Sequence, residues 1–178
     1  MNRDIKTELT WGVIIGIVTI LWMTFEYILG TTLGRPDLGT YTGFFSVIIP
    51  ILGLSFGLRQ KRKELGGKLT FGEGVKAGLI ISVISAVIAS LFVFIFLSFF
   101  PQVTDSFLEY ARQLIIESGG TEETASATIE QLRAQFQPLP QAIYMFFGTV
   151  ITGTIISLIV SAFIKTKRKE PEQKIDIS

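Results

Sequence analysis

Residues 77–100 read AGLIISVISAVIASLFVFIFLSFF and contain no charged side chain. A helix of about 20 apolar residues crosses the ~30 Å hydrocarbon core of a membrane. A core helix of a soluble bundle would show a polar stripe every 3.6 residues, and none is seen here. Three more apolar stretches of similar length lie at 10–29, 41–58 and 141–164. Since backbone groups in lipid must be satisfied within their own segment, we expect an all-α integral membrane protein with four transmembrane helices.

The composition agrees with this class and excludes much familiar chemistry. Of 178 residues, 48% are hydrophobic and only 17% are charged, against about 25% charged in a typical soluble domain. The mean hydropathy is +0.51. The chain contains no Cys and no His, so disulfides, thiol nucleophiles, the usual zinc sites and histidine triads are ruled out. The net charge of +1 gives no bulk attraction for nucleic acid. From these observations together we expect no enzyme activity, catalytic residue, metal, cofactor or nucleic-acid partner.

The basic residues predict the orientation in the membrane. Most of the 16 Lys and Arg residues lie before the first stretch, between the second and third, or after the fourth, and only Arg35, Arg112 and Arg133 fall on the other side. Cytoplasmic loops carry the excess of Lys and Arg. Both termini and the middle loop are therefore predicted to be cytoplasmic, in a multi-pass membrane protein.

The segment 102–137 is the only sizeable part expected outside the bilayer. Apolar residues recur there at helical spacing, namely Val103, Phe107, Tyr110, Leu114, Ala125, Ile129, Leu132 and Phe136. A non-cytoplasmic helical hairpin is therefore expected between helices three and four. Its apolar stripe either packs the hairpin or docks another membrane protein. The predicted organisation is one domain, 1–168, with helices at about 10–29, 41–58, 71–100 and 140–164, followed by a disordered cytoplasmic tail at 169–178.

Small residues recur four apart in the predicted helices, a spacing that lets helix backbones approach closely in lipid. These rows either close the four helices on each other or form the seam of a homo-oligomer. Their members are Gly12, Gly16, Gly53, Gly57, Gly74, Gly78, Ser82, Ala86, Gly153, Ser157 and Ser161. Before the third helix, Thr70 and Glu73 have the spacing of a capping box, which predicts a helix start near Phe71.

Glu26 is the one ionisable side chain well inside an apolar stretch. An intramembrane carboxylate is a candidate functional site, and the nearest groups that could complete a polar site are Tyr27, Tyr41 and Arg35. The alternative is a carboxylate that reaches the interface or bonds a neighbouring helix and has no further role.

The layout of apolar stretches and the sequence LTFGEGVKAG at residues 69–78 resemble a family of small bacterial membrane proteins known as domain of unknown function 4199. The resemblance covers about residues 5–168. It implies the four-helix topology and an inner-membrane location, and it supplies no site residue because the family has no assigned activity.

Two functions remain open from the sequence. The first is a non-enzymatic accessory or scaffold protein whose 102–137 hairpin meets another membrane protein. The alternative is a small oligomeric transporter or channel that uses Glu26 in a polar path. Few polar groups lie within the predicted helices, which favours the first function.

Overall fold

The chain is all-α, as predicted. The computed structural model describes residues 5–32 and 38–166, with side chains described for 5–30 and 46–166, and this part of the chain contains six helices and no strand. The helices are α1 (Lys6–Thr32), α2 (Leu38–Glu64), α3 (Phe71–Phe99), α4 (Pro101–Glu117), α5 (Glu122–Gln135) and α6 (Pro138–Ile164).

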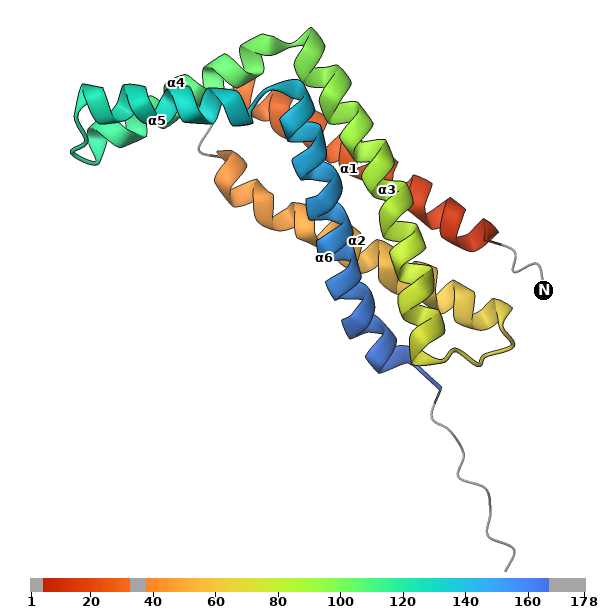
Figure 1. The fold of residues 1–178 in the computed structure, drawn as a ribbon. Helices are drawn as coiled ribbons and strands as arrows, with labels where there is room; N and C mark the ends of the chain where they lie inside the picture. Colours follow the sequence, from red (N-terminus) through yellow and green to blue (C-terminus); the bar gives the residue numbers. More distant parts are fainter. Residues whose placement is uncertain (1–4, 33–37, 167–178) are drawn as a thin grey trace, which may run out of the picture.

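The four long helices form a bundle with α3 at its centre, packed most extensively against α6 and α1 (Figure 1). Helix α2 packs on α1 and α6. One end of the bundle, here called the basic end, carries the start of α1, the 65–70 loop and the end of α6. At the other end, the hairpin end, α4 and α5 lie side by side and project away from the bundle (Figure 1).

Among the described residues, three helices are long and apolar enough to cross a membrane: Lys6–Gly30, Phe71–Phe99 and Pro138–Ile164. They indicate a membrane protein. The predicted fourth span corresponds to α2, which is as long as α1 and α6 but ends in the basic residues Lys61, Arg62 and Lys63. Four spans and their orientation therefore stay predictions.

The helices α1 and α2 extend beyond the apolar stretches that predicted them. Lys, Arg, Gln and Glu are good helix formers, so the polar residues after Leu58 continue α2 to Glu64. The helix ends only where Gly66 and Gly67 take positive φ angles of 67° and 81°, a conformation that glycine adopts without steric cost. The length of an apolar stretch therefore underestimates the length of the helix that contains it.

Helix α3 begins at Phe71, directly after its cap. The Thr70 hydroxyl accepts a hydrogen bond from the Glu73 backbone N–H, and the Glu73 carboxylate accepts from the Thr70 N–H at 3.1 Å. The end of α6 is fastened to this start, because the Thr166 N–H donates to the Leu69 carbonyl and the Leu69 N–H donates to the Thr166 hydroxyl, at 2.9 and 3.0 Å. Two helix ends far apart in the sequence are therefore fixed together.

The antiparallel seam between α3 and α6 is built from small residues. A Cβ on Gly74 would lie 2.4 Å from the Ser161 Oγ, one on Gly78 2.1 Å from the Ser157 Oγ, and one on Gly153 2.1 Å from the Ser82 Oγ. The Ser82 and Ser157 hydroxyls donate to the carbonyls four residues earlier in their own helices, at 2.7 and 2.6 Å, so they are satisfied although buried. Ala86, one turn beyond Ser82, is also fully buried.

The glycines of α1 and α2 make similar approaches. Gly12 and Gly16 of α1 face Ile84 and Ile88 of α3, while Gly53 and Gly57 of α2 face Ile15 and Trp11 of α1. The small rows are thus occupied by neighbouring helices of the same chain. Between them lies a core of four buried side chains, Ile15, Leu54, Ile81 and Ile156.

The hairpin turns where Gly119 has a φ of 90°, and Thr121 caps α5 by accepting from the Thr124 N–H. Its packed face agrees in part with the predicted stripe. In α5, Ala125 of the stripe is fully buried. In α4, Leu108 outside the stripe is only 2% exposed, whereas Leu114 of the stripe is 47% exposed. Residues at three- and four-residue steps match several faces of a short helix, and the neighbouring helix decides which face is buried.

Candidate functional site

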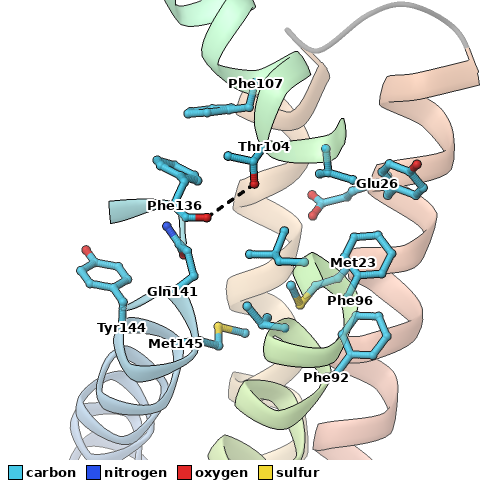
Figure 2. Close-up of a pocket in the computed structure, with 14 residues that line it drawn as sticks. Met23, Glu26, Phe92, Phe96, Thr104, Phe107, Phe136, Gln141, Tyr144 and Met145 are labelled. Carbon is cyan, nitrogen blue, oxygen red and sulfur yellow. Dashed lines mark hydrogen bonds between the residues drawn. The ribbon is translucent and has the colours of Figure 1, made fainter. Parts of the chain in front are cut away.

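A cavity of about 450 Å³ lies at the hairpin end, between α1, α3, the start of α4 and the start of α6 (Figure 2). Sites for small molecules are concave, mostly apolar spaces of roughly 300–1,000 Å³ with a few polar groups. This cavity has that character, and it is lined by Met23, Glu26, Tyr27, Phe92, Val93, Phe96, Leu97, Val103, Thr104, Phe107, Phe136, Gln141, Tyr144 and Met145.

Glu26 reaches the cavity from the last turns of α1. It lies 20 residues after Lys6, so at 1.5 Å per residue it is about 30 Å along the helix axis. Figure 2 shows its carboxylate directed into the space between α1, α4 and α6. The side chain is half-buried, so a molecule in the cavity can contact it.

Aromatic rings form the wall next to Glu26. Phe92, Phe96 and Phe100 succeed each other at four-residue steps along α3, with ring centroids 5.4 and 5.2 Å apart. Tyr27 meets Phe96 edge to face at 5.1 Å. In this row of α3 the phenylalanines follow Ile84 and Ile88, which pack against Gly12 and Gly16 of α1. The cavity lies at the level of the larger rings.

The remaining walls come from the hairpin and α6. Phe107 of α4 and Phe136, which follows α5, have ring centroids 4.6 Å apart. The Thr104 hydroxyl makes a long hydrogen bond of 3.5 Å to the Phe136 carbonyl (Figure 2). Tyr144 is 78% exposed, which places it at the rim. Gln141 adds an amide to the lining.

Of the four residues predicted to form a polar site, the structure brings two into the cavity, Glu26 and Tyr27. The side chain of Tyr41 and the whole of Arg35 lie outside the described residues. The sequence interpretation missed the aromatic row of α3 and the contribution of Thr104 and Gln141. The four-residue spacing of Phe92, Phe96 and Phe100 was a visible signal for the former.

A second, smaller cavity of about 250 Å³ adjoins the first along α6, because Tyr144 and Met145 line both. Its surface is mostly apolar, and its lining includes the hydroxyl-bearing residues Thr19, Ser46, Ser85, Thr149 and Thr152. Towards the basic end it stops at Ile15, a member of the buried core.

The basic end holds an ion pair that the sequence interpretation missed. The Lys61 Nζ lies 2.9 Å from a carboxylate oxygen of Glu8, and both side chains are nearly buried, at 11% and 5% exposed. Beside the pair, the Thr7 hydroxyl donates to the Glu64 carboxylate. The sequence counted Lys61 only among residues that set orientation, since nothing local distinguishes it from exposed Lys63.

The outer surface of the hairpin carries two exposed ion pairs, Arg112–Glu122 at 2.7 Å and Arg133–Asp105 at 3.0 Å. The hydrogen bond from Arg112 to Glu122 raises the pKa of the Arg112 guanidinium above its usual value. Among the described residues no group of three or more acidic side chains could hold a metal ion.

The helices able to cross a membrane define the class, a membrane protein, and an open cavity lies between α1, α3, α4 and α6. Residues 10–166 match the family described as protein of unknown function (DUF4199). The chain belongs to this family, which confirms the resemblance seen around residues 69–78. No curated protein and no solved structure matches it.

Proposed function

We propose that this chain is a non-enzymatic, multi-pass protein of the bacterial inner membrane that binds a small amphipathic molecule in the hairpin-end cavity. The observation that carries the proposal is the position of Glu26, which lines about 450 Å³ of mostly apolar space. Of the two functions predicted from the sequence, this geometry supports the small transporter or channel that uses Glu26 more than the accessory or scaffold protein, because a scaffold requires no such cavity.

The absence of catalysis is part of the proposal. Acid–base chemistry commonly uses a donor and an acceptor in one protected place. In the described lining of the cavity Glu26 is the single carboxylate, and its polar neighbours are hydroxyl and amide groups such as Thr104 and Gln141. These groups suit hydrogen bonding to a ligand.

In the proposed topology α2 is the fourth span, with the basic end in the cytoplasm and the hairpin outside. The 27 residues of α2 give about 40 Å of helix, and exposed basic residues such as Arg59 and Lys68 gather at the basic end. A cysteine introduced at Thr121 should react with a membrane-impermeant maleimide from the outside only. Labelling from the cytoplasmic side alone would show that the topology is the opposite of the proposed one.

Binding can be tested with N-phenyl-1-naphthylamine, a neutral fluorescent amphiphile. Trp22 lies one helical turn before Glu26, so bound probe should accept energy from it, and empty nanodiscs give the background of probe dissolved in lipid. Saturable energy transfer is expected with the protein in nanodiscs. Signal that rises linearly with probe concentration, as in empty nanodiscs, would contradict the proposal.

Two valines of α3 provide matched variants for this test. Val93 lines the cavity and is 6% exposed, whereas Val87 is 50% exposed. Val93→Phe fills part of the space and should reduce the saturable signal several-fold, while Val87→Phe leaves it unchanged. Thermal unfolding of both variants establishes that they are folded. Equal signals from the two folded variants would place the probe elsewhere.

A second candidate function is the accessory role, in which the hairpin contacts another membrane protein. The observation in its favour is the exposed apolar side chains of α4, Leu114 at 47% and Ile116 at 38%. Cross-linking in the native membrane followed by mass spectrometry should then join the hairpin to one heterologous protein, and Leu114→Glu should release it without lowering thermal stability. Cross-links only between copies of this chain would instead indicate a homo-oligomer.

A further inference from the structure

In the part of its lining that the structure describes, the hairpin-end cavity carries charge of one sign. Glu26 is the only charged residue in its described lining. The adjacent segment 101–137 carries six acidic residues and only two basic ones, Arg112 and Arg133. Both arginines are held in ion pairs on the hairpin surface. The cavity and the surface beside it therefore favour a cation, both by direct contact and by the field around the entrance.

The walls suit an organic cation better than a metal ion. A metal ion would need several oxygen ligands at short range, and the described part of the chain groups no three acidic side chains. Aromatic faces attract cations that have little hydration of their own. Phe92 and Phe96 stand on the α3 wall and Phe107 and Phe136 on the hairpin wall, so rings lie on two sides of the space (Figure 2).

The lining of the cavity is mostly apolar. It includes the side chains of Val93, Leu97 and Met145. A molecule with a charged centre and apolar arms could place the charge at Glu26 and the arms against these side chains and the rings. A small hydrated cation would leave the apolar walls without a partner.

We propose that the ligand of this cavity is a lipophilic organic cation, held by the Glu26 carboxylate and the surrounding aromatic rings. The inference rests on the proposed binding function and adds the charge of the ligand. It predicts that charge, at constant size and shape, decides which molecules bind.

Tetraphenylphosphonium and tetraphenylborate provide the test, because they have nearly the same shape and opposite charge. Triphenylphosphine oxide serves as a neutral probe of related shape. Each is equilibrated by dialysis with the full-length protein in detergent micelles, with protein-free micelles as background. Tetraphenylphosphonium is expected to show saturable binding at least 10-fold tighter than the oxide, and tetraphenylborate none.

Variants then test the role of Glu26. Glu26→Gln keeps the size of the side chain and removes its charge, so it should weaken tetraphenylphosphonium binding at least 10-fold. Glu26→Asp keeps the charge and should retain most of the affinity. Glu130→Gln removes an exposed carboxylate from α5 of the same hairpin, and it should change the affinity less than two-fold.

The outcomes separate this inference from the proposed function. Equal binding of all three probes, or equal affinity of wild type and folded Glu26→Gln, overturns cation selectivity while a binding cavity remains. Equal weakening by Glu26→Gln and Glu130→Gln also overturns it, because general surface charge would then explain the effect. No saturable binding of these probes or of N-phenyl-1-naphthylamine overturns both proposals.

Discussion

The two ends of this bundle are made by the same helices and packed in different ways. At the basic end, a Cβ added to Gly78 would lie 2.1 Å from the Ser157 hydroxyl oxygen. At the hairpin end, α1, α3 and α6 surround a cavity of about 450 Å³. The row of α3 that faces α1 changes from Ile84 and Ile88, which fit against glycines, to Phe92 and Phe96, which pack against each other and Tyr27. Along the contact between α1 and α3, residue size at a constant spacing thus separates a tightly packed stretch from a cavity, while a second space of about 500 Å³ at the basic end lies next to the Lys61–Glu8 pair.

The closest helix contacts and the buried ion pair lie at the basic end, and the proposed binding cavity lies at the hairpin end. Without a hydrophobic effect between helices in lipid, close contact of backbones and buried polar pairs must hold the bundle together. Both are found at the basic end, in the α3–α6 seam and in the Lys61–Glu8 pair. Substitutions there should cost more stability than substitutions around the cavity.

The largest effect is expected from Lys61→Met, which leaves the Glu8 carboxylate buried without its partner. Loss of one member of a buried ion pair costs about 3–5 kcal/mol, and the lower figure applies at the edge of the bundle. Unfolding by SDS titration, followed by circular dichroism, measures the loss. Lys63→Met, two residues away and exposed, is the matched control and should be near neutral.

A double variant refines this result. Adding Glu8→Gln to Lys61→Met removes the unpaired charge and should restore part of the lost stability. If Lys61→Met and Lys63→Met unfold at the same SDS fraction, the buried pair contributes nothing to stability. The α3–α6 seam would then be the only one of the two named features that stabilises the basic end.

The next effect is expected from Gly78→Ala, which forces α3 and α6 apart at their closest approach. Overpacking of this kind costs about 1–3 kcal/mol. Gly148 of α6 has nothing within 4 Å of its added Cβ, so Gly148→Ala should be neutral or stabilise by up to about 1 kcal/mol through helix propensity. Thermal unfolding in one detergent compares the two variants. A stabilised Gly78→Ala would show that the seam is not tight.

A smaller effect is expected from Phe96→Leu at the hairpin end. The change removes ring contacts with Tyr27, Phe92 and Phe100, each of which contributes about 0.5–1.5 kcal/mol at most. Since Phe96 already borders the cavity, no new enclosed void forms, and we expect a net loss of about 1 kcal/mol in the same unfolding assay. A loss as large as that of Lys61→Met would mean that the two ends are equally well packed.

The smallest effect is expected from Arg133→Gln on the hairpin surface. Its pair with Asp105 is exposed on both sides, at 48% and 60%, and such pairs contribute about 0–1 kcal/mol. The unfolding midpoint of Arg133→Gln should differ from that of wild type by no more than the midpoint of Lys63→Met does. A clear shift would show that the hairpin contributes to the stability of the bundle.

Particular residues show how far sequence reasoning reached. The start of α3 followed from Thr70 and Glu73, because a capping box is a local pattern. The glycine rows pointed to close helix contacts for the same reason, although they did not say which helices would meet. Leu108 and Lys61 could not have been found this way. Each is buried by a partner that lies far away in the sequence, and an amphipathic pattern or a basic run leaves the choice of face open.

The candidate site also has a part that the sequence predicted and a part that only the tertiary structure revealed. Glu26 was singled out by the sequence because a carboxylate in an apolar stretch is costly and therefore informative. That it lines a cavity together with Phe96, Phe136 and Gln141 follows only from the crossing of α1, α3 and α6 and the placement of the hairpin. The sequence by itself determined the helices, their apolar lengths and the small residues available for packing, since these depend on local hydrogen bonding and on transfer from water to lipid. The tertiary structure alone decided which rows met and where the bundle stayed open, because packing depends on side chains that chain order does not bring together.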